Sequence, residues 1–295
     1  MLVRRLLLVP SVFLVAGCGH THRAAGTLVR FRVVGHATAA DLDRTVEIVR
    51  HRIDDLGLRD AALMRTGRVI SIRLSGGTRR ELAPIIGKQG VLEFYDFEAD
   101  LAPPSVSGLN GTPVAKANLR DLLGGAKRVP RNTVVVTCDN RSHECPTTVP
   151  GNARTGFFLF KHIAGKVPEM TGRDLQESTI RADVDPTTNQ PIVVFQFTQR
   201  GKRIFREIIR REAHRGQLMG NCLQSPPASA QHFAIVLDRQ IESAPYIDYC
   251  KNPDGIPGDN GAQIDFGSAG SIGAAKRVAL VLRTGALPVR LVRIR

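Results

Sequence analysis

The sequence predicts an α+β protein with mostly antiparallel sheets. Segments in which apolar residues alternate with arginine, such as residues 29–33 and 289–294, are typical of half-buried strands. Longer segments with apolar residues three and four positions apart, such as residues 42–56 and 204–209, are typical of helices with one buried face. Short polar turns join two pairs of the expected strands, and such turns favour antiparallel pairing.

The first compact region, residues 28–98, has the element order β-α-β-β-α-β of a ferredoxin-like unit. Its elements are expected, in chain order, at residues 29–33, 38–56, 61–65, 69–74, 78–88 and 91–97. Thr38 or Asp41 is the expected cap of the first helix, and Gly57 ends it. The buried stripe of that helix is expected to be Leu42, Val46, Val49, Ile53 and Leu56. The sequence therefore predicts a base subdomain.

Residues 99–167 are less regular. Helix and strand patterns are interrupted by Pro103-Pro104, Asn110-Gly111 and Gly124-Gly125. One strand is expected before the first cysteine of this region, at residues 133–137, and order returns at Gly156 with a strand at residues 157–161. We interpret this stretch as an insertion or linker closed by a disulfide loop.

Residues 168–284 are expected to form an α+β head subdomain. Strand pairs are expected at residues 180–184 with 192–197, and at residues 233–237 with 241–247. Thr198 and Ser271 open the two long helices, and Gly285 ends the second. A final strand is expected within the last residues, 285–295.

The N-terminus has the pattern of an export signal. Arg4 and Arg5 precede an apolar run that is too short to span a bilayer, and small residues then lead to Cys18. A cysteine in this position resembles the lipobox of bacterial lipoproteins, in which the thiol is acylated. We expect residues 1–17 to be the signal peptide, Cys18 to carry the lipid, and residues 18–27 to be a tether. The alternatives are an ordinary signal peptide with a chance cysteine, or a brief membrane anchor.

Four further cysteines are an even number for an exported chain. Cys138 and Cys145 flank a short polar stretch, and Cys222 and Cys250 bracket an apolar β segment. We expect each pair to form a disulfide. A metal site that includes His143 is the rival interpretation, but the Cys-x4-His-x-Cys spacing fits no zinc pattern.

The chain carries a formal net charge of +14, and 33 of its 41 basic residues are arginine. An exported protein does not meet nucleic acid, so anionic lipid headgroups or acidic wall polymers are the expected counterions. The candidate anionic-surface residues lie on one helix: Arg200, Lys202, Arg203, Arg206, Arg210 and Arg211, interrupted by Glu207 and Glu212. The bland alternative is a solvated outer face in an arginine-rich protein.

Catalytic and cofactor motifs do not occur in the sequence. It has no G-x-S-x-G elbow, P-loop or H-E-x-x-H segment. Asp254, Asp259 and Asn260 lack the spacing of an EF-hand and are interpreted as turn residues. We therefore expect no enzyme activity, no cofactor and no metal.

Six segments in order resemble the SecD family of protein-export subunits. They begin at residues 45–57 and 85–94 and continue through Met170-Thr-Gly-Arg-Asp-Leu175, Ala234-Ile-Val-Leu-Asp238, Ile241-Glu-Ser-Ala-Pro245 and residues 280–288. The resemblance implies the large extracytoplasmic domain of SecD. Residues 28–98 would be its base, completed by the final strand at residues 285–295, and residues 168–284 its head, in a region similar to a mobile arm that contacts exported polypeptides. The family's ion-coupling membrane segments have no counterpart in the sequence, and Arg239 stands where the family usually has glycine.

These observations together predict a stand-alone lipoprotein on the extracytoplasmic face of the membrane. It would bind unfolded exported polypeptides or Sec translocase components, without proton coupling of its own. Exposed strand edges and an apolar crevice between base and head are the expected contact modes. The alternative is an envelope scaffold that binds wall polymer or another envelope protein.

Overall fold

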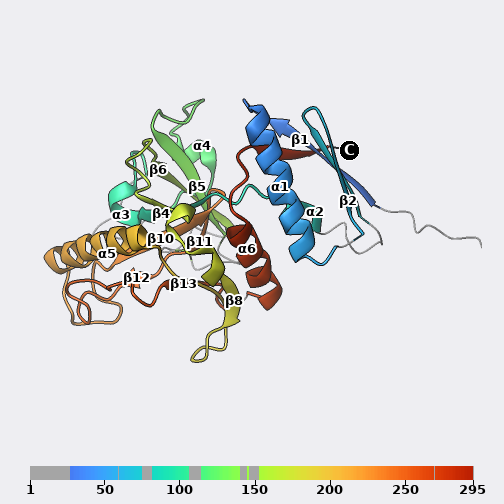
Figure 1. Ribbon diagram of the computed structural model, residues 1–295. Coiled ribbons are helices and arrows are strands. Elements are labelled where there is room, and N and C mark those ends of the chain that lie inside the picture. Colours follow the sequence, from blue (N-terminus) through green and yellow to red (C-terminus); the bar gives the residue numbers. More distant parts are fainter. Residues whose placement is uncertain are drawn as a thin grey trace, which may run out of the picture.

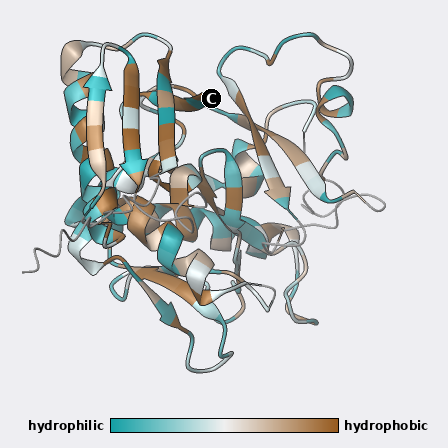
Figure 2. Cartoon of the chain, turned by 90° about the vertical axis from the view of Figure 1, so that its right-hand side faces the viewer, coloured by the Kyte–Doolittle hydropathy of each residue, from teal (hydrophilic) through white to brown (hydrophobic). Residues whose placement is uncertain are grey.

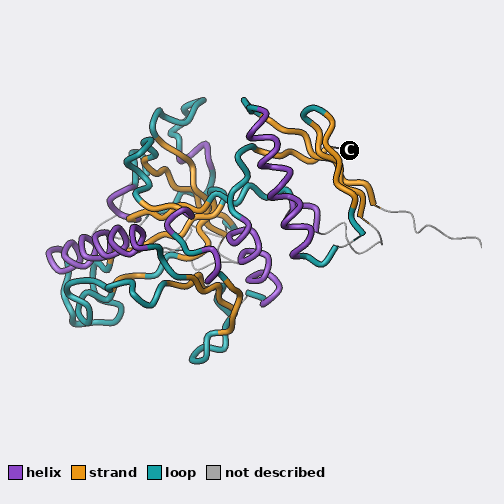
Figure 3. Tube along the Cα trace, in the orientation of Figure 1, coloured by secondary structure: helices purple, strands orange, loops and turns teal. Residues whose placement is uncertain are grey.

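A computed structural model describes residues 27–58, 60–74, 82–105, 114–139, 145, 153–268 and 270–294. A smaller base and a larger head stand side by side, with the base on the right in Figure 1. The described elements combine helices with mostly antiparallel sheets, which confirms the predicted α+β fold class. Figure 3 shows that helices lie against strands in both parts.

The base is a four-stranded antiparallel sheet in the order β14-β1-β3-β2. Its elements are β1 (Thr27–Val34), α1 (Ala39–Asp55), β2 (Ala62–Thr66), β3 (Val69–Leu74), α2 (Ala83–Ile86) and β14 (Arg290–Ile294). Val29, Phe31 and Val33 of β1 are buried, whereas the arginines between them are exposed. This alternation of hydropathy along strands is visible in Figure 2.

The fourth strand of the base is β14, the final strand that was expected to complete it, whereas the strand expected at residues 91–97 leaves the ferredoxin-like unit. The expected strand β4 (Leu92–Asp96) pairs with β10 (Gln231–Leu237) in the head, and the C-terminal β14 takes the fourth place beside β1. All five residues of β4 are buried, which is the pattern of a central strand covered on both faces. The arginine-bearing β14 has exposed positions and suits the edge of a sheet.

The large sheet of the head has seven strands in the described residues. Its order is β6-β5-β11-β10-β4-β7, with β12 also paired to β10. The remaining strands are β5 (Thr133–Asp139), β6 (Thr155–Lys161), β7 (Met170–Thr171), β11 (Gln240–Ser243) and β12 (Tyr246–Ile247). Residues 99–167 therefore supply two strands of this sheet, β5 and β6; both strands were expected from the sequence, but as parts of an insertion or linker and not of the head sheet. Their buried Phe158 and Phe160 pack against Phe97.

A second, three-stranded sheet lies in the head and has the order β13-β9-β8. It consists of β8 (Arg181–Val184), β9 (Pro191–Phe195) and β13 (Ala262–Asp265), and helix α6 (Ile272–Thr284) packs against it. Short helices α3 (Phe97–Asp100), α4 (Leu119–Leu122), η3 (Gly172–Asp174) and η4 (Glu177–Thr179) connect strands. The antiparallel pairing of β8 with β9 was predicted from the sequence and is confirmed.

The predicted helix caps are present. Thr38 and Asp41 form a reciprocal capping box at the start of α1, and the Ser271 hydroxyl accepts from the Ala274 N–H at 3.1 Å. The buried face of α1 differs from the expected stripe: it consists of Thr45, Ile48, Val49, Arg52 and Ile53, while Leu42, Val46 and Leu56 are half-buried. The buried face of α1 is rotated from the expected stripe because the helix packs against α6 as well as against its own sheet.

Helix α5 (Gln199–Met219) lies along the head, and Thr198 caps it. Glu212, which we expected on the solvated face, is fully buried. It follows Ile209 and Ile208 by three and four positions, so it falls on their face of the helix. Neither of its carboxylate oxygens has a hydrogen-bond partner in the described residues. Burial, with Asp96 and then Glu98 nearby, raises its pKa well above 4.5 against the opposing effect of Arg215 and Arg211.

We predict that Glu212→Gln changes the pH dependence of stability. The folded state of the native protein retains a proton that the unfolded state releases above about pH 4.5. Glu212 therefore costs stability as the pH rises from that value to its folded pKa, with a slope of up to about 1.4 kcal/mol per pH unit. Urea unfolding at several pH values should show that the free energy of unfolding of the variant rises relative to that of the native protein as the pH rises.

The matched control is Glu207→Gln, which changes an exposed glutamate on the same helix. Its unfolding free energy should run parallel to that of the native protein. If the Glu212→Gln curve also ran parallel, the buried carboxyl would not hold the extra proton.

Candidate binding cleft between base and head

The chain crosses between base and head at two places that lie side by side. The first crossing joins α2 to β4 through residues 87–91, and the second joins α6 to β14 through residues 285–289. The Leu287 N–H donates to the Gln89 carbonyl at 2.7 Å, which ties the two crossings together. The two crossings, together with the packing of α1 against α6, therefore position the base relative to the head.

Arg52 of α1 is fully buried at this junction. Its guanidinium donates to the Ile86 carbonyl at 3.1 Å, to the Lys88 carbonyl, to the Thr284 hydroxyl at 3.0 Å and to the Gly285 carbonyl at 2.8 Å. Burial lowers the pKa of Arg52 to about 10, with Asp238 opposing the shift, so the group stays charged at neutral pH. One side chain of the base thus holds both crossings.

Asp238 supports the first crossing from the head. Its carboxylate accepts from the N–H groups of Gly90 at 3.0 Å and Val91 at 2.8 Å. Gly90 has a φ of +80°, and a Cβ there would lie 2.8 Å from Val281 and 3.0 Å from Arg52. Glycine is therefore required at this position, because the backbone conformation and the close packing both exclude a side chain.

A cavity of about 560 Å³ opens beside this junction. Its walls come from α1, both crossings, the start of β4, the segment around η3 and the end of α6. The apolar lining includes Ile48, Val91, Leu92, Leu175, Leu282 and Leu287. The volume suits a few apolar side chains of an extended segment, and the base and head each supply part of the wall.

Charged groups at the cavity differ in how they are neutralised. Arg44 pairs with Glu47 at 2.7 Å, whereas exposed Arg173 has no ion-pair partner in the described part of the chain. Glu93 is buried and accepts from Tyr95 at 3.1 Å, and it also contacts His162 at 3.0 Å. Burial and then Glu93 raise the pKa of Tyr95, so its hydroxyl remains a donor.

The arrangement supplies recognition groups and lacks the geometry of a metal centre. Within the described ranges, no cluster of three or more His, Cys, Asp or Glu side chains is placed to hold a metal ion. The cavity offers apolar walls, one unpaired arginine and backbone groups. These are the features of a site that binds a ligand by shape, apolar contact and hydrogen bonding.

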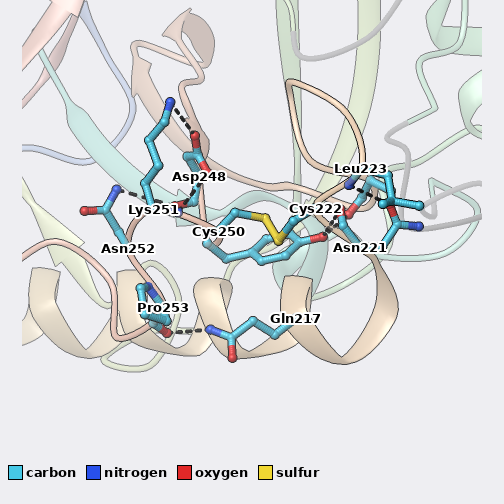
Figure 4. Close-up of a disulfide and its surroundings, with 11 residues drawn as sticks. Gln217, Asn221, Cys222, Leu223, Asp248, Cys250, Lys251, Asn252 and Pro253 are labelled. Atoms are coloured by element: carbon cyan, nitrogen blue, oxygen red, sulfur yellow. Dashed lines mark hydrogen bonds and ion pairs between the residues drawn. A yellow bond between two sulfur atoms is a disulfide. The ribbon is translucent and has the colours of Figure 1, made fainter.

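Both expected disulfides are present. Cys138 pairs with Cys145 and Cys222 with Cys250, each with a Cα–Cα distance of 5.8 Å. Figure 4 shows the second bridge close to α5, with Gln217 on the helix below it. Cys18 and His143 lie outside the described residues.

The basic residues of α5 are mostly engaged by the protein's own carboxylates. Arg200 pairs with Asp174, Arg211 pairs with Glu169, and Lys202 and Arg206 lie 3.8 and 3.7 Å from Asp259. Arg203 and Arg210 are exposed and have no carboxylate at ion-pair distance among the described residues. Two of the six candidate residues therefore remain available to an anionic partner.

Sequence reasoning missed Arg52 and the burial of Glu212, whereas it expected an apolar crevice between base and head. Arg52 stands between Val49 and Ile53, on the side of α1 that carries the apolar stripe, and this position was the available signal.

No helix in the described part of the chain is long and apolar enough to cross a membrane.

We predict that Arg52→Met weakens the junction between base and head. The change keeps most of the apolar stem but leaves the carbonyls of Ile86, Lys88 and Gly285 without their donor, so it should lower the free energy of unfolding by about 3 kcal/mol. Urea denaturation measures the loss. Arg50→Met, on the exposed face of the same helix, is the control. Equal stability of the two variants would show that Arg52 does not hold the crossings.

Comparison with known proteins places the chain among export subunits. Residues 154–289 match the family described as SecDF, P1 head subdomain. The chain is 31% identical over 298 residues to the protein translocase subunit SecD of Rhodobacter capsulatus. The aligned region covers 97% of this chain and 42% of the relative. It is 27% identical to the SecD subunit of Elusimicrobium minutum, over 84% of this chain and 44% of the relative. The chain spans less than half the length of these curated relatives.

Solved structures share the fold. A SecDF structure in a super-membrane-facing form matches with a TM-score of 0.55 and 23% identity, over 92% of this chain and 30% of that chain. A second, described as a membrane component SecDF that enhances protein export, gives a TM-score of 0.54 and 23% identity, over 91% of this chain and 98% of that chain. The chain is therefore similar to SecD subunits along nearly its whole length, and residues 154–289 match the SecDF P1 head subdomain.

Proposed function

We propose that this protein is a non-catalytic, lipid-anchored SecD-like protein that binds exported polypeptides on the extracytoplasmic face of the membrane. The cleft between base and head is the observation that carries this proposal. An unfolded polypeptide exposes apolar side chains together with backbone donors and acceptors. A cavity with apolar walls recognises the apolar side chains without requiring one sequence.

The construction of the cleft supports a binding role. Its walls belong to two bodies joined through the crossings at residues 87–91 and 285–289. A small change at the junction alters the width of the cleft, because hinge closure is set by a few residues at element ends. The relatives' name, protein translocase subunit SecD, and the description of a SecDF that enhances protein export agree with an export role.

Site-specific photocrosslinking tests the binding site. A photoreactive residue at Ala286 or Arg173, which both line the cleft and are exposed, should give adducts with a precursor arrested during translocation. The same residue at Met64, which is 64% exposed on β2 and does not line the cleft, is the control. The proposed site would be refuted if no adducts formed although the protein is abundant, or if the photoreactive residue at Met64 gave the same yield of adducts. Adducts with another envelope protein when no precursor is present would instead support the scaffold alternative.

Acylation of Cys18 is the proposed mode of membrane attachment. The residue lies outside the described residues, and the signal-like pattern before it is the support. Cys18→Ser should abolish metabolic labelling with palmitate and block removal of residues 1–17, because the thiol is the acylated group. Cys145→Ser should keep the label. Unchanged labelling and processing of Cys18→Ser would contradict lipid attachment at this position.

A further inference from the structure

The far end of α5 displays apolar side chains to solvent. Leu218 is 88% exposed and Leu223 is 91% exposed, which are the highest values among the large hydrophobic residues of the described ranges. Met219 between them is 49% exposed. We call these three residues the apolar tip. Exposed leucines are common singly, but two nearly complete exposures within six residues of chain indicate a contact surface.

The apolar tip is held on a rigid support. Cys222, next to Leu223, is bonded to Cys250, and the Tyr249 hydroxyl lies 2.9 Å from the Asn221 carbonyl and 2.6 Å from the Ala228 carbonyl. The Gln217 side chain donates to the Pro253 carbonyl at 2.6 Å (Figure 4). These bonds hold the backbone on both sides of Leu218 and Leu223. The leucines protrude from an ordered support and do not owe their exposure to a loose loop.

The charges around the apolar tip select the partner. Residues 216–231 contain no Asp, Glu, Lys, Arg or His, although 23% of the whole chain is charged. Arg210 lies two turns before Leu218, about 12 Å along the helix, and Arg203 lies two turns before Arg210. Both arginines are exposed and free of carboxylates at ion-pair distance in the described part of the chain. In the neighbouring loop, Asp248 pairs with Lys251 at 3.0 Å and Asp254 lies 3.7 Å from His214. An apolar tip on an uncharged segment, followed by free arginines, matches a surface that is apolar inside and anionic outside.

We propose that the apolar tip inserts into the headgroup region of an anionic lipid bilayer, with Arg203 and Arg210 beside the lipid phosphates. A protein partner requires a contiguous complementary face, whereas polar Asn221 and Gln224 separate the exposed side chains here. A fluid bilayer accepts isolated protruding leucines and solvates the polar groups between them. This contact is independent of acylation at Cys18, because its residues lie in the head.

A single-tryptophan reporter tests the insertion directly. The native chain contains no tryptophan, so Leu223→Trp places one reporter at the apolar tip, on a side chain exposed enough to leave folding unaffected. Emission of the full-length protein should shift to the blue on vesicles of phosphatidylglycerol and phosphatidylcholine, and brominated lipids should quench it. Phosphatidylcholine alone should give a weaker response. Met64→Trp, exposed on the base, is the control and should not respond.

Second changes in the Leu223→Trp background separate the two contributions. Leu218→Ser should lower the inserted fraction roughly tenfold, since it removes one buried leucine side chain from the contact. Arg203→Gln with Arg210→Gln should remove the preference for phosphatidylglycerol. Flotation of the protein reports the acyl anchor separately from the tryptophan emission. Vesicle-bound protein with unshifted emission would overturn the proposal, and so would emission that shifts only when a precursor polypeptide is added.

Discussion

The arrangement of base and head depends on the hydrogen bonds that one buried cation, Arg52, makes. The Arg52 guanidinium is removed from water without contacting a carboxylate, and backbone carbonyls of both crossings together with the Thr284 hydroxyl take its donors. The carbonyl oxygens hold the planar guanidinium by directional hydrogen bonds, but they do not neutralise its charge. Each acceptor must therefore stay in place for the charged group to remain buried. The base therefore constrains the two crossings, and through them the cleft.

Exchange of strands between the two parts of the chain makes this junction necessary. The chain leaves the base before β4 and returns as β14, so the base is closed by a strand that is more than 200 residues away from β1. Hydrophobic burial explains the choice, because β4 is buried at every position and β14 is not. Closing a sheet across such a separation carries a loop-closure entropy that Arg52 and the Leu287–Gln89 bond help to offset.

Local signals in the sequence predicted local structure well. The caps at Thr38, Thr198 and Ser271, the pairing of β8 with β9 and the two disulfides depend on residues close in sequence or on cysteine number. The pairing of β4 with β10 and the place of β5 and β6 in the head sheet depend on distant partners, which periodicity does not identify. Glu212 shows the same limit, since its place on the apolar face was readable but its burial beside Asp96 was not.

Helix α5 connects the two proposed contact surfaces. At its start, the Thr198 N–H donates to the Asp174 carbonyl at 2.8 Å, and a Cβ on Gly201 would meet that carbonyl at 2.4 Å, so the helix is packed tightly against η3 beside the cleft. Its other end carries the apolar tip. A helix of 21 residues is about 30 Å long, which places polypeptide binding and lipid contact at opposite ends of one rigid element. Movement of the helix relative to the base therefore displaces both surfaces together.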